Sequence, residues 1–242
     1  MIALLALIFA LLPPAAFGGA QPLALDPDEV LARYASALEN APTPKLAVFE
    51  YAIEQAGLHD FIQTHRVYRA GRDERDETLA VSGKSISPPL VRIFHKRIDR
   101  YAISRLAPTP ERYTFAFVGT RKTGKHLDYI YRTLRHTPAA FEVTSVTIDG
   151  LRFLPASISF VTAQGRVHGS GTINFTKSDR YWVPVLAVAV ANVAEDHARE
   201  RIAFTGYRFP ISLPRSTFSV PKPLASETPA PLASATPAPP AR

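Results

Sequence analysis

The stretch from Phe141 to Phe218 constrains the fold more than any other part of the chain, because its apolar residues recur at every second position. This alternation puts successive side chains on opposite faces of a strand, so each strand has one apolar face. The alternating pairs are Val146 and Ile148, Leu151 and Phe153, Ile158 and Phe160, and Ile173 and Phe175. A long antiparallel sheet with one apolar face must cover that face, and what covers it is the functional question.

One amphipathic helix is predicted near the N-terminus, from Asp26 to Asn40. Asp26 is a favoured capping residue, and Pro27 suits the first helical turn. Apolar residues at i, i+3, i+4, i+7 and i+8 form one stripe, which is typical of a helix that packs on a core. We expect this helix to be a lid over the apolar face of the sheet. Its contacts with that face are predicted to be Val30, Leu31, Tyr34 and Leu38.

Between this helix and the alternating stretch, the sequence predicts further strands separated by turns. These strands are 46–56, 61–70, 77–83, 113–118 and 127–134. The charged run Arg72–Glu77 is expected at a hairpin tip, and residues 88–101 fit either a helix or an irregular strand. Altogether about ten strands and one or two helices are expected, which is a mainly β (α+β) fold.

Both ends of the chain differ in composition from the middle. Residues 1–20 contain an apolar run without charge, followed by prolines and small residues, and are predicted to be a secretory signal peptide cleaved after Gly18 or Ala20. An uncleaved anchor or a buried helix is the alternative. Residues 221–242 are rich in Pro, Ala, Ser and Thr and are predicted to be a disordered tail, used as a spacer or without function. Residues 21–220 are expected to form one domain.

The cysteine count and the net charge narrow the class of protein. The chain has no cysteine, which excludes disulfides, thiolate metal sites and a cysteine nucleophile. Its formal net charge is +7, which suits nucleic acid, anionic lipid or an ordinary solvated surface. Because an exported protein meets little nucleic acid, lipid headgroups are the more economical partner of the two, and an ordinary solvated surface is the interpretation of the charge that we favour.

The segment from Gly119 to His126 nearly matches the phosphate-binding loop G-x-x-x-x-G-K-[ST]. The last position of that loop must supply a hydroxyl to a metal ion, and His126 has none. The loop must also open a helix, whereas residues 127–134 are rich in strand-forming residues. A hairpin turn is therefore predicted here in place of a nucleotide site.

No catalytic or metal-binding pattern stands out in the sequence. There is no G-x-S-x-G motif, and no pair of carboxylates is set among apolar residues. The seven histidines have no metal-type spacing, and His59 and His65 are expected in solvent around a turn. We predict that the protein is not an enzyme and has no catalytic residue, metal ligand or cofactor.

Trp182, the only tryptophan, begins a predicted strand beside Pro184. A proline restricts a strand to the edge of a sheet or to a bulge. Residues 182–194 are predicted to form a buried strand pair. A core position and a ligand contact are both compatible with Trp182.

Several segments, taken in order, resemble the LolA/LolB-like periplasmic lipoprotein-carrier superfamily, which includes outer-membrane lipoprotein-sorting proteins. The resemblance covers residues 26–218. It lies in the N-terminal helix and in the segments Tyr113-Thr-Phe-Ala-Phe-Val-Gly119, Val146-Thr-Ile-Asp149, Leu154-Pro-Ala-Ser-Ile-Ser-Phe160, Tyr181-Trp-Val-Pro184, Arg201–Phe209 and Leu213–Phe218. It implies an unclosed antiparallel barrel of about eleven strands, with helices as a lid over an apolar concave face that accepts acyl chains. The Pro-rich tail departs from the family pattern.

Together these observations predict a monomeric periplasmic carrier or binding protein that shields acyl chains of lipids or lipoproteins without catalysis. The residues expected to line the apolar cavity are Phe115, Phe117, Ile158, Phe160, Ile173, Phe175 and Trp182. One alternative is an envelope sensor or scaffold domain of the same fold, with a filled concavity and an outer apolar patch that binds a protein partner. The other is an envelope hydrolase, which requires a buried histidine or carboxylate that points inward.

Overall fold

The computed structural model describes residues 24–57, 60–96, 102–164, 167–193 and 196–219. The predicted signal peptide (1–20) and tail (221–242) lie outside the described residues, as does His59. The division of the chain into signal, domain and tail therefore stays a prediction. No helix in the described part of the chain is both long and apolar enough to cross a membrane.

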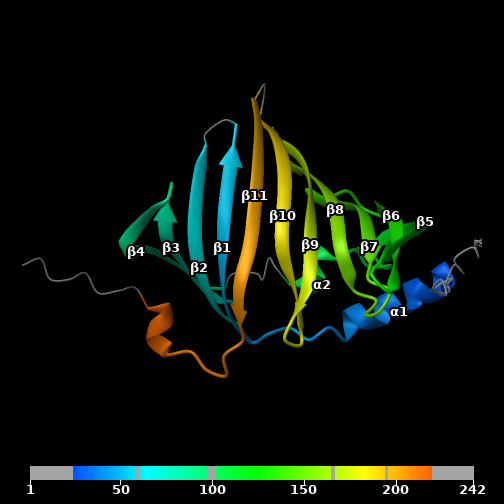
Figure 1. Cartoon of the computed structure of the whole chain (residues 1–242), viewed down its shortest axis with the longest axis horizontal. Coiled ribbons are helices and arrows are strands. Elements are labelled where there is room, and N and C mark those ends of the chain that lie inside the picture. The colour runs from blue at the N-terminus through cyan, green and yellow to red at the C-terminus, as the bar shows by residue number, and fades with distance from the viewer. Residues whose placement is uncertain (1–23, 58–59, 97–101, 165–166, 194–195, 220–242) are drawn as a thin grey trace, which may run out of the picture.

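Eleven strands form one antiparallel sheet (Figure 1). In chain order they are β1 (Leu46–Ala56), β2 (Phe61–Ala70), β3 (Asp73–Val81), β4 (Lys84–Phe94), β5 (Tyr113–Thr123), β6 (His126–Arg135), β7 (Phe141–Ile148), β8 (Pro155–Gln164), β9 (Val167–Ser178), β10 (Tyr181–Val193) and β11 (Asp196–Arg208). Strands consecutive in the chain pair with one another, except at the step from β4 to β5, and β1 pairs with β11. The two edge strands of the sheet are thus β4 and β5. This open sheet of eleven strands confirms the predicted fold class.

The alternating apolar residues set the register of the sheet. One row of cross-strand partners runs from β6 to β11 through Tyr131, Val146, Ile158, Ile173, Ala187 and Ile202. The first four of these side chains are buried, whereas the next residue along each strand points to the opposite face. This row defines what we call the inner face of the sheet.

The inner face carries two clusters of buried apolar side chains. The larger cluster extends over β5 to β10, and the smaller one lies on β1, β2 and β11. Ala187 packs against both clusters. The apolar core is therefore continuous across the middle of the sheet.

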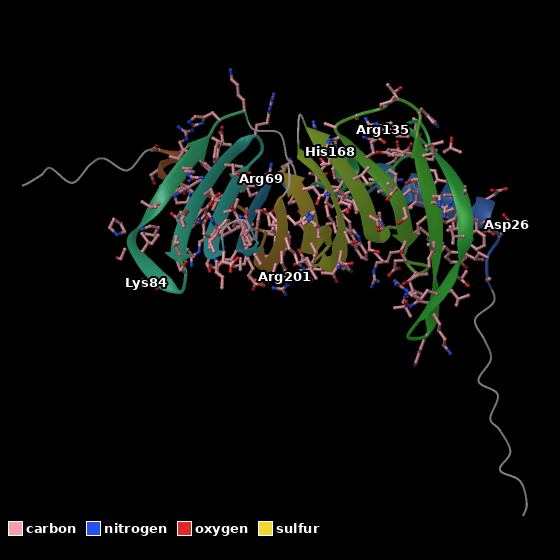
Figure 2. The ribbon with its side chains drawn as sticks, turned by 90° about the horizontal axis from the view of Figure 1, so that it is seen from above. Asp26, Arg69, Lys84, Arg135, His168 and Arg201 are labelled. Carbon is pink, nitrogen blue, oxygen red and sulfur yellow. The ribbon has the colours of Figure 1, made fainter. Side chains whose placement is uncertain are left out.

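The helix α1 (Pro27–Glu39) covers the larger cluster. The Asp26 carboxylate accepts a hydrogen bond from the Asp28 N–H at 2.8 Å and so caps the helix as predicted. Seen from above, Asp26 lies beside β5 and β6, whereas Lys84 of β4 lies at the opposite end of the curved sheet (Figure 2).

The chain crosses between the two end strands in the connection that follows β4. This connection contains the short helix α2 (Ile103–Leu106), which contacts α1 and β10. After β11, the 3₁₀ helix η1 (Arg215–Phe218) contacts β3, where the Arg75 guanidinium donates to the Thr217 carbonyl at 3.1 Å. The predicted lid thus consists of α1 and the connection with α2.

Two local predictions needed correction, and a third segment adopts one of the two structures left open for it. The charged run Arg72–Glu77 is not a hairpin tip, because β3 begins at Asp73 and pairs its acidic residues with β2. The ambiguous segment forms the strand β4 from Lys84, and residues 97–101 lie outside the described part. Residues 182–193 belong to the single strand β10 rather than to a strand pair, since Pro184 adjoins an irregularity of register without ending the strand.

Candidate functional site

All seven predicted cavity residues lie on or beside the covered inner face. Six of them belong to the larger core cluster: Phe115, Ile158, Phe160, Ile173, Phe175 and Trp182. Phe117 is 45% exposed and meets the ring of the buried Tyr131 edge-on at 5.5 Å. The structure therefore brings the seven side chains together, and their contact with a ligand stays a prediction.

The four predicted lid residues face the sheet. Val30, Tyr34 and Leu38 are buried, and Leu31 is partly buried against the same cluster. The Tyr34 ring packs edge-on against Phe115, with 6.0 Å between the ring centroids. α1 therefore contacts the sheet through one apolar stripe, as its sequence period predicts.

Three hydrogen bonds that involve tyrosine hydroxyls attach α1 to its surroundings. Tyr34 Oη donates to the Pro108 carbonyl in the connection, and Tyr131 Oη donates to the Pro27 carbonyl, each at 2.8 Å. The Leu25 N–H donates to Tyr129 Oη at 2.8 Å. These bonds lie at the start and middle of the helix.

Burial keeps the two donor hydroxyls protonated. It raises the pKa of the Tyr34 phenol, an effect that nearby Arg112 only partly opposes. Burial also raises the pKa of the Tyr131 phenol, and negative charge at Asp28 and Asp26 adds to that rise. Both side chains are therefore stable hydrogen-bond donors to α1 and its connection at neutral pH.

One small cavity lies beside the connection. The cavity between the connection and strands β1, β10 and β11 has a volume of about 50 Å³, and Ile103 and Trp182 are among its lining residues. Ligand sites usually measure about 300–1,000 Å³. This cavity is therefore too small for an acyl chain unless the connection moves.

Small residues form the inner face beyond the lid. On β10 they are Ala189 and Ala191, whose partners on β9 are Gly171 and Gly169. These four residues are only partly buried. We call them the small-residue floor, and the Phe160 side chain lies over Gly171 at one end of it. The floor continues the inner face beyond Phe160 with side chains that are small and only partly buried.

The smaller cluster contains a buried polar group that the sequence analysis missed. His65 is 4% exposed, and its Nδ1 lies 2.8 Å from Asp76 Oδ1. Tyr51 Oη donates to Asp76 Oδ2 at 2.9 Å and its ring stacks on His65. The expectation that His65 lies in solvent was wrong, because β2 points it to the inner face. The available signal lay in the pairing of neighbouring strands. Tyr51 lies opposite His65, and Asp76 lies opposite Val67, two residues further along β2, so all three side chains point to one face.

Hydrogen bonds determine the charge of Asp76. Burial alone would raise the pKa of its carboxyl, but hydrogen bonds from His65 and Tyr51 outweigh burial and lower the pKa. The second ring nitrogen of His65 lies 3.1 Å from Gln63 Oε1. Because both ring nitrogens are occupied, the group resembles a structural network more than a general base awaiting a substrate.

No protein-family model and no curated protein matches the chain. Among solved structures, it is similar to a LolA superfamily protein from Nitrosomonas europaea, with 12% identity, 81% of this chain and 99% of that one covered, and a TM-score of 0.41. It is also similar to a putative outer-membrane lipoprotein-sorting protein domain from Vibrio parahaemolyticus, with 14% identity, coverage of 79% and 97%, and a TM-score of 0.46. A third match is the MucA/MucB complex structure from Pseudomonas aeruginosa, with 10% identity, coverage of 76% and 99%, and a TM-score of 0.22.

Proposed function

We propose that this protein is a periplasmic carrier or binding protein that shields an acyl chain of a lipid or lipoprotein against its inner face, without catalysis. The observation that carries the proposal is the position of α1. This helix covers a continuous apolar face through one stripe of side chains, and the small-residue floor extends that face beyond the helix.

The energies of the lid and of an acyl chain are of similar size. Burial of each large apolar side chain contributes about 1.5–3 kcal/mol, so the three buried lid residues, Val30, Tyr34 and Leu38, contribute roughly 5–9 kcal/mol together. An acyl chain contributes about 0.8 kcal/mol for each buried methylene. A long chain can therefore replace the contacts of α1, whereas a short chain cannot. This balance suits reversible uptake and release.

Native mass spectrometry of the delipidated protein tests this proposal with palmitate and octanoate as probes. Palmitate should bind in a saturable manner, and octanoate should bind at least about tenfold more weakly, since it offers fewer methylenes for burial. Equal binding of the two fatty acids would indicate non-specific adsorption, and absence of palmitate binding would contradict the proposal.

A second candidate function is the binding of an envelope protein partner. The small volume of the cavity beside the connection favours it, because a filled concavity was the feature expected of a sensor or scaffold domain. The outer apolar patch expected with it is less evident, since the exposed large apolar side chains among the described residues are spread over several strands and two loops: Ile62, Leu90, Phe117, Val118, Leu134, Leu151, Val161, Val190 and Ile211. A pull-down from envelope extract that retrieves one protein, together with no palmitate binding, would favour this function.

A further inference from the structure

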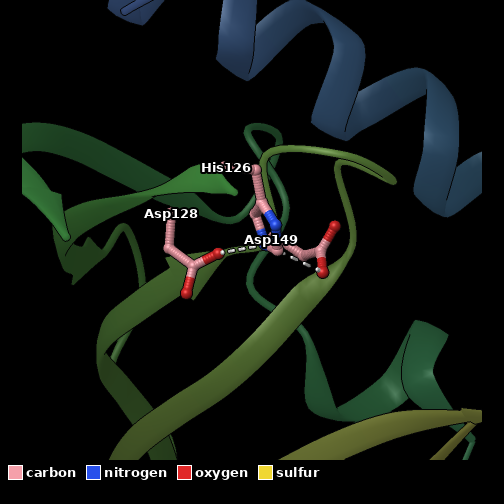
Figure 3. A group of neighbouring side chains, drawn as sticks. All are labelled: His126, Asp128 and Asp149. Atoms are coloured by element: carbon pink, nitrogen blue, oxygen red, sulfur yellow. Dashed lines mark ion pairs between the residues drawn. The ribbon is translucent and has the colours of Figure 1, made fainter. Parts of the chain in front are cut away.

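Three polar side chains converge at one end of the sheet (Figure 3). His126 and Asp128 lie at the start of β6, and Asp149 directly follows β7. One potential ligand atom from each residue lies within 4.8 Å of the other two. His126 Nε2 is 3.3 Å from Asp128 Oδ1 and 3.8 Å from Asp149 Oδ2.

Each carboxylate is held through one oxygen and presents the other oxygen to His126. Asp128 Oδ2 accepts from Thr123 Oγ1 at 2.6 Å and from the Arg121 guanidinium at 3.3 Å. Asp149 Oδ1 accepts from the backbone N–H groups of Leu151 and Arg152, at 2.9 and 2.8 Å. Oriented carboxylates of this kind are typical of metal sites, where supporting hydrogen bonds fix the ligands.

The oxygen of Asp128 that faces His126 has no hydrogen-bond partner. Asp128 is 2% exposed, and both its Oδ1 and the Nε2 of His126 are buried without a hydrogen bond. A buried polar atom without a partner costs about 1–3 kcal/mol, and more if it is charged. A cation between the two atoms would satisfy both of them at once.

We propose that His126, Asp128 and Asp149 bind a divalent transition-metal ion of the zinc class. Zinc bonds to imidazole nitrogen and carboxylate oxygen are about 2.0–2.2 Å long, which puts ligand atoms about 3.4 Å apart in a tetrahedron. The 3.3 Å from His126 Nε2 to Asp128 Oδ1 matches that spacing, whereas the 3.8 Å to Asp149 Oδ2 is longer, and all three ligand atoms lie within 4.8 Å of one another. A ligand set with one imidazole favours zinc over calcium or magnesium, which prefer oxygen ligands alone.

Two arginines partly offset the negative charge of the site. Arg121 contacts Asp128 on the side away from His126, and the Arg152 guanidinium lies 3.7 Å from Asp149 Oδ2. The Arg152 side chain is 45% exposed and can turn towards solvent when a cation binds. A tetrahedral ion held by these three residues would take water in its fourth position, as in zinc sites with three protein ligands.

Gly150 holds the third ligand against β6. A Cβ at this position would lie 1.9 Å from the Leu127 carbonyl oxygen and 3.1 Å from the Tyr129 ring. Only glycine therefore allows the turn after Asp149 to approach the strand that carries His126 and Asp128. A bound metal ion would fasten this turn to β6, in a chain that has no cysteine for a disulfide.

The test is zinc titration of the full chain after treatment with a chelator, by calorimetry and by native mass spectrometry. A single equivalent of zinc should bind and raise the melting temperature, and cobalt should give the visible absorption of a four-coordinate site. His126→Gln should weaken zinc binding by more than about 100-fold, since loss of a supporting residue alone costs about 10–100-fold. Thr123→Val and Gly150→Ala change supporting residues, so each should weaken zinc binding by about 10–100-fold.

His95→Gln is the matched control, because His95 forms an exposed ion pair with Asp73 at 3.1 Å and lies far along the chain from the site. It should leave zinc affinity unchanged. His126 is partly exposed, so its substitution by Gln should leave the apo fold intact by circular dichroism. The proposal is overturned if the native chain takes up no zinc, or if folded His126→Gln binds zinc as tightly as the native chain.

Discussion

The Tyr34 hydroxyl donates a 2.8 Å hydrogen bond to the Pro108 carbonyl, which joins α1 to the connection between β4 and β5. This bond links the two segments that cover the inner face, although they lie far apart in the sequence. Tyr34 also packs on Phe115 of the sheet. One side chain thus holds the helix to both the connection and the apolar face.

Alkaline pH should weaken the attachment of α1. Burial raises the pKa of Tyr34 and of Tyr131 above the ordinary value of about 10. The unfolded chain then loses these protons first, so the contribution to stability is complete below about pH 10 and decreases as the pH rises further. Urea unfolding of Tyr34→Phe/Tyr131→Phe should show a smaller loss of stability above that pH than the native chain. If the free energy of unfolding fell equally steeply with pH in the two proteins, Tyr34 and Tyr131 would not be the source of the loss.

The Asp76 carboxylate should stabilise the protein except in acid. Its folded pKa is lower than the ordinary value of 3.8, so the unfolded state takes up the proton first as the pH falls. The stabilisation by the Asp76 carboxylate is therefore complete above the ordinary pKa and is lost as the pH falls through the folded pKa. Asp76→Asn should cost about 1–3 kcal/mol at neutral pH and should flatten the acid limb of stability. An acid limb as steep as in the native chain would show that Asp76 is not its source.

A side chain at position 171 should disrupt the inner face. A Cβ there would lie 2.5 Å from the Val188 carbonyl oxygen and 2.7 Å from Phe160 Cζ. Gly171→Ala should therefore destabilise the protein by about 1–3 kcal/mol, as overpacking does. Gly169→Ala is the milder comparison, because its nearest contact is 3.1 Å. The melting temperature of Gly171→Ala should be lower than that of Gly169→Ala. The reverse order would contradict the packing of Phe160 over Gly171.

A large side chain on the small-residue floor should impair acyl binding. Ala189→Phe would occupy the space of a few methylenes, worth about 2 kcal/mol or roughly 30-fold in palmitate affinity. Val188→Phe is the matched control, since Val188 is the next residue on β10 and points to the other face. Calorimetric titration with palmitate should give a lower affinity for Ala189→Phe than for Val188→Phe. Equal affinities would place the acyl chain elsewhere.

The apolar face of the sheet and the helix that covers it could be predicted largely from the sequence. Alternation at Ile158, Phe160, Ile173 and Phe175 defines one face, and the capped stripe of α1 supplies its cover. Local periodicity and capping chemistry determine both features, so a single sequence reveals them.

The buried polar groups could not be predicted in the same way. The acidic residues of β3 read as a solvated turn until the pairing of β2 with β3 brings Asp76 beside Val67, on the inner face close to His65. His126 and Asp149 belong to different strands, and only the turn at Gly150 brings them together. Partners across strands depend on register and turns, which alternation alone does not specify.

Energy transfer from Trp182 to a label on α1 tests the central claim that this helix is a movable lid. Trp182 is the only tryptophan and belongs to the cluster under α1, and the chain has no cysteine, so Ala32→Cys gives a single labelling site on the exposed side of the helix. A label at Thr176→Cys on β9, across from Val183, is the fixed reference. Palmitate should lower transfer to the label at position 32 in a saturable manner, octanoate should not, and transfer to the label at position 176 should stay constant. Saturable palmitate binding without any change in transfer from Trp182 to α1 would contradict the account.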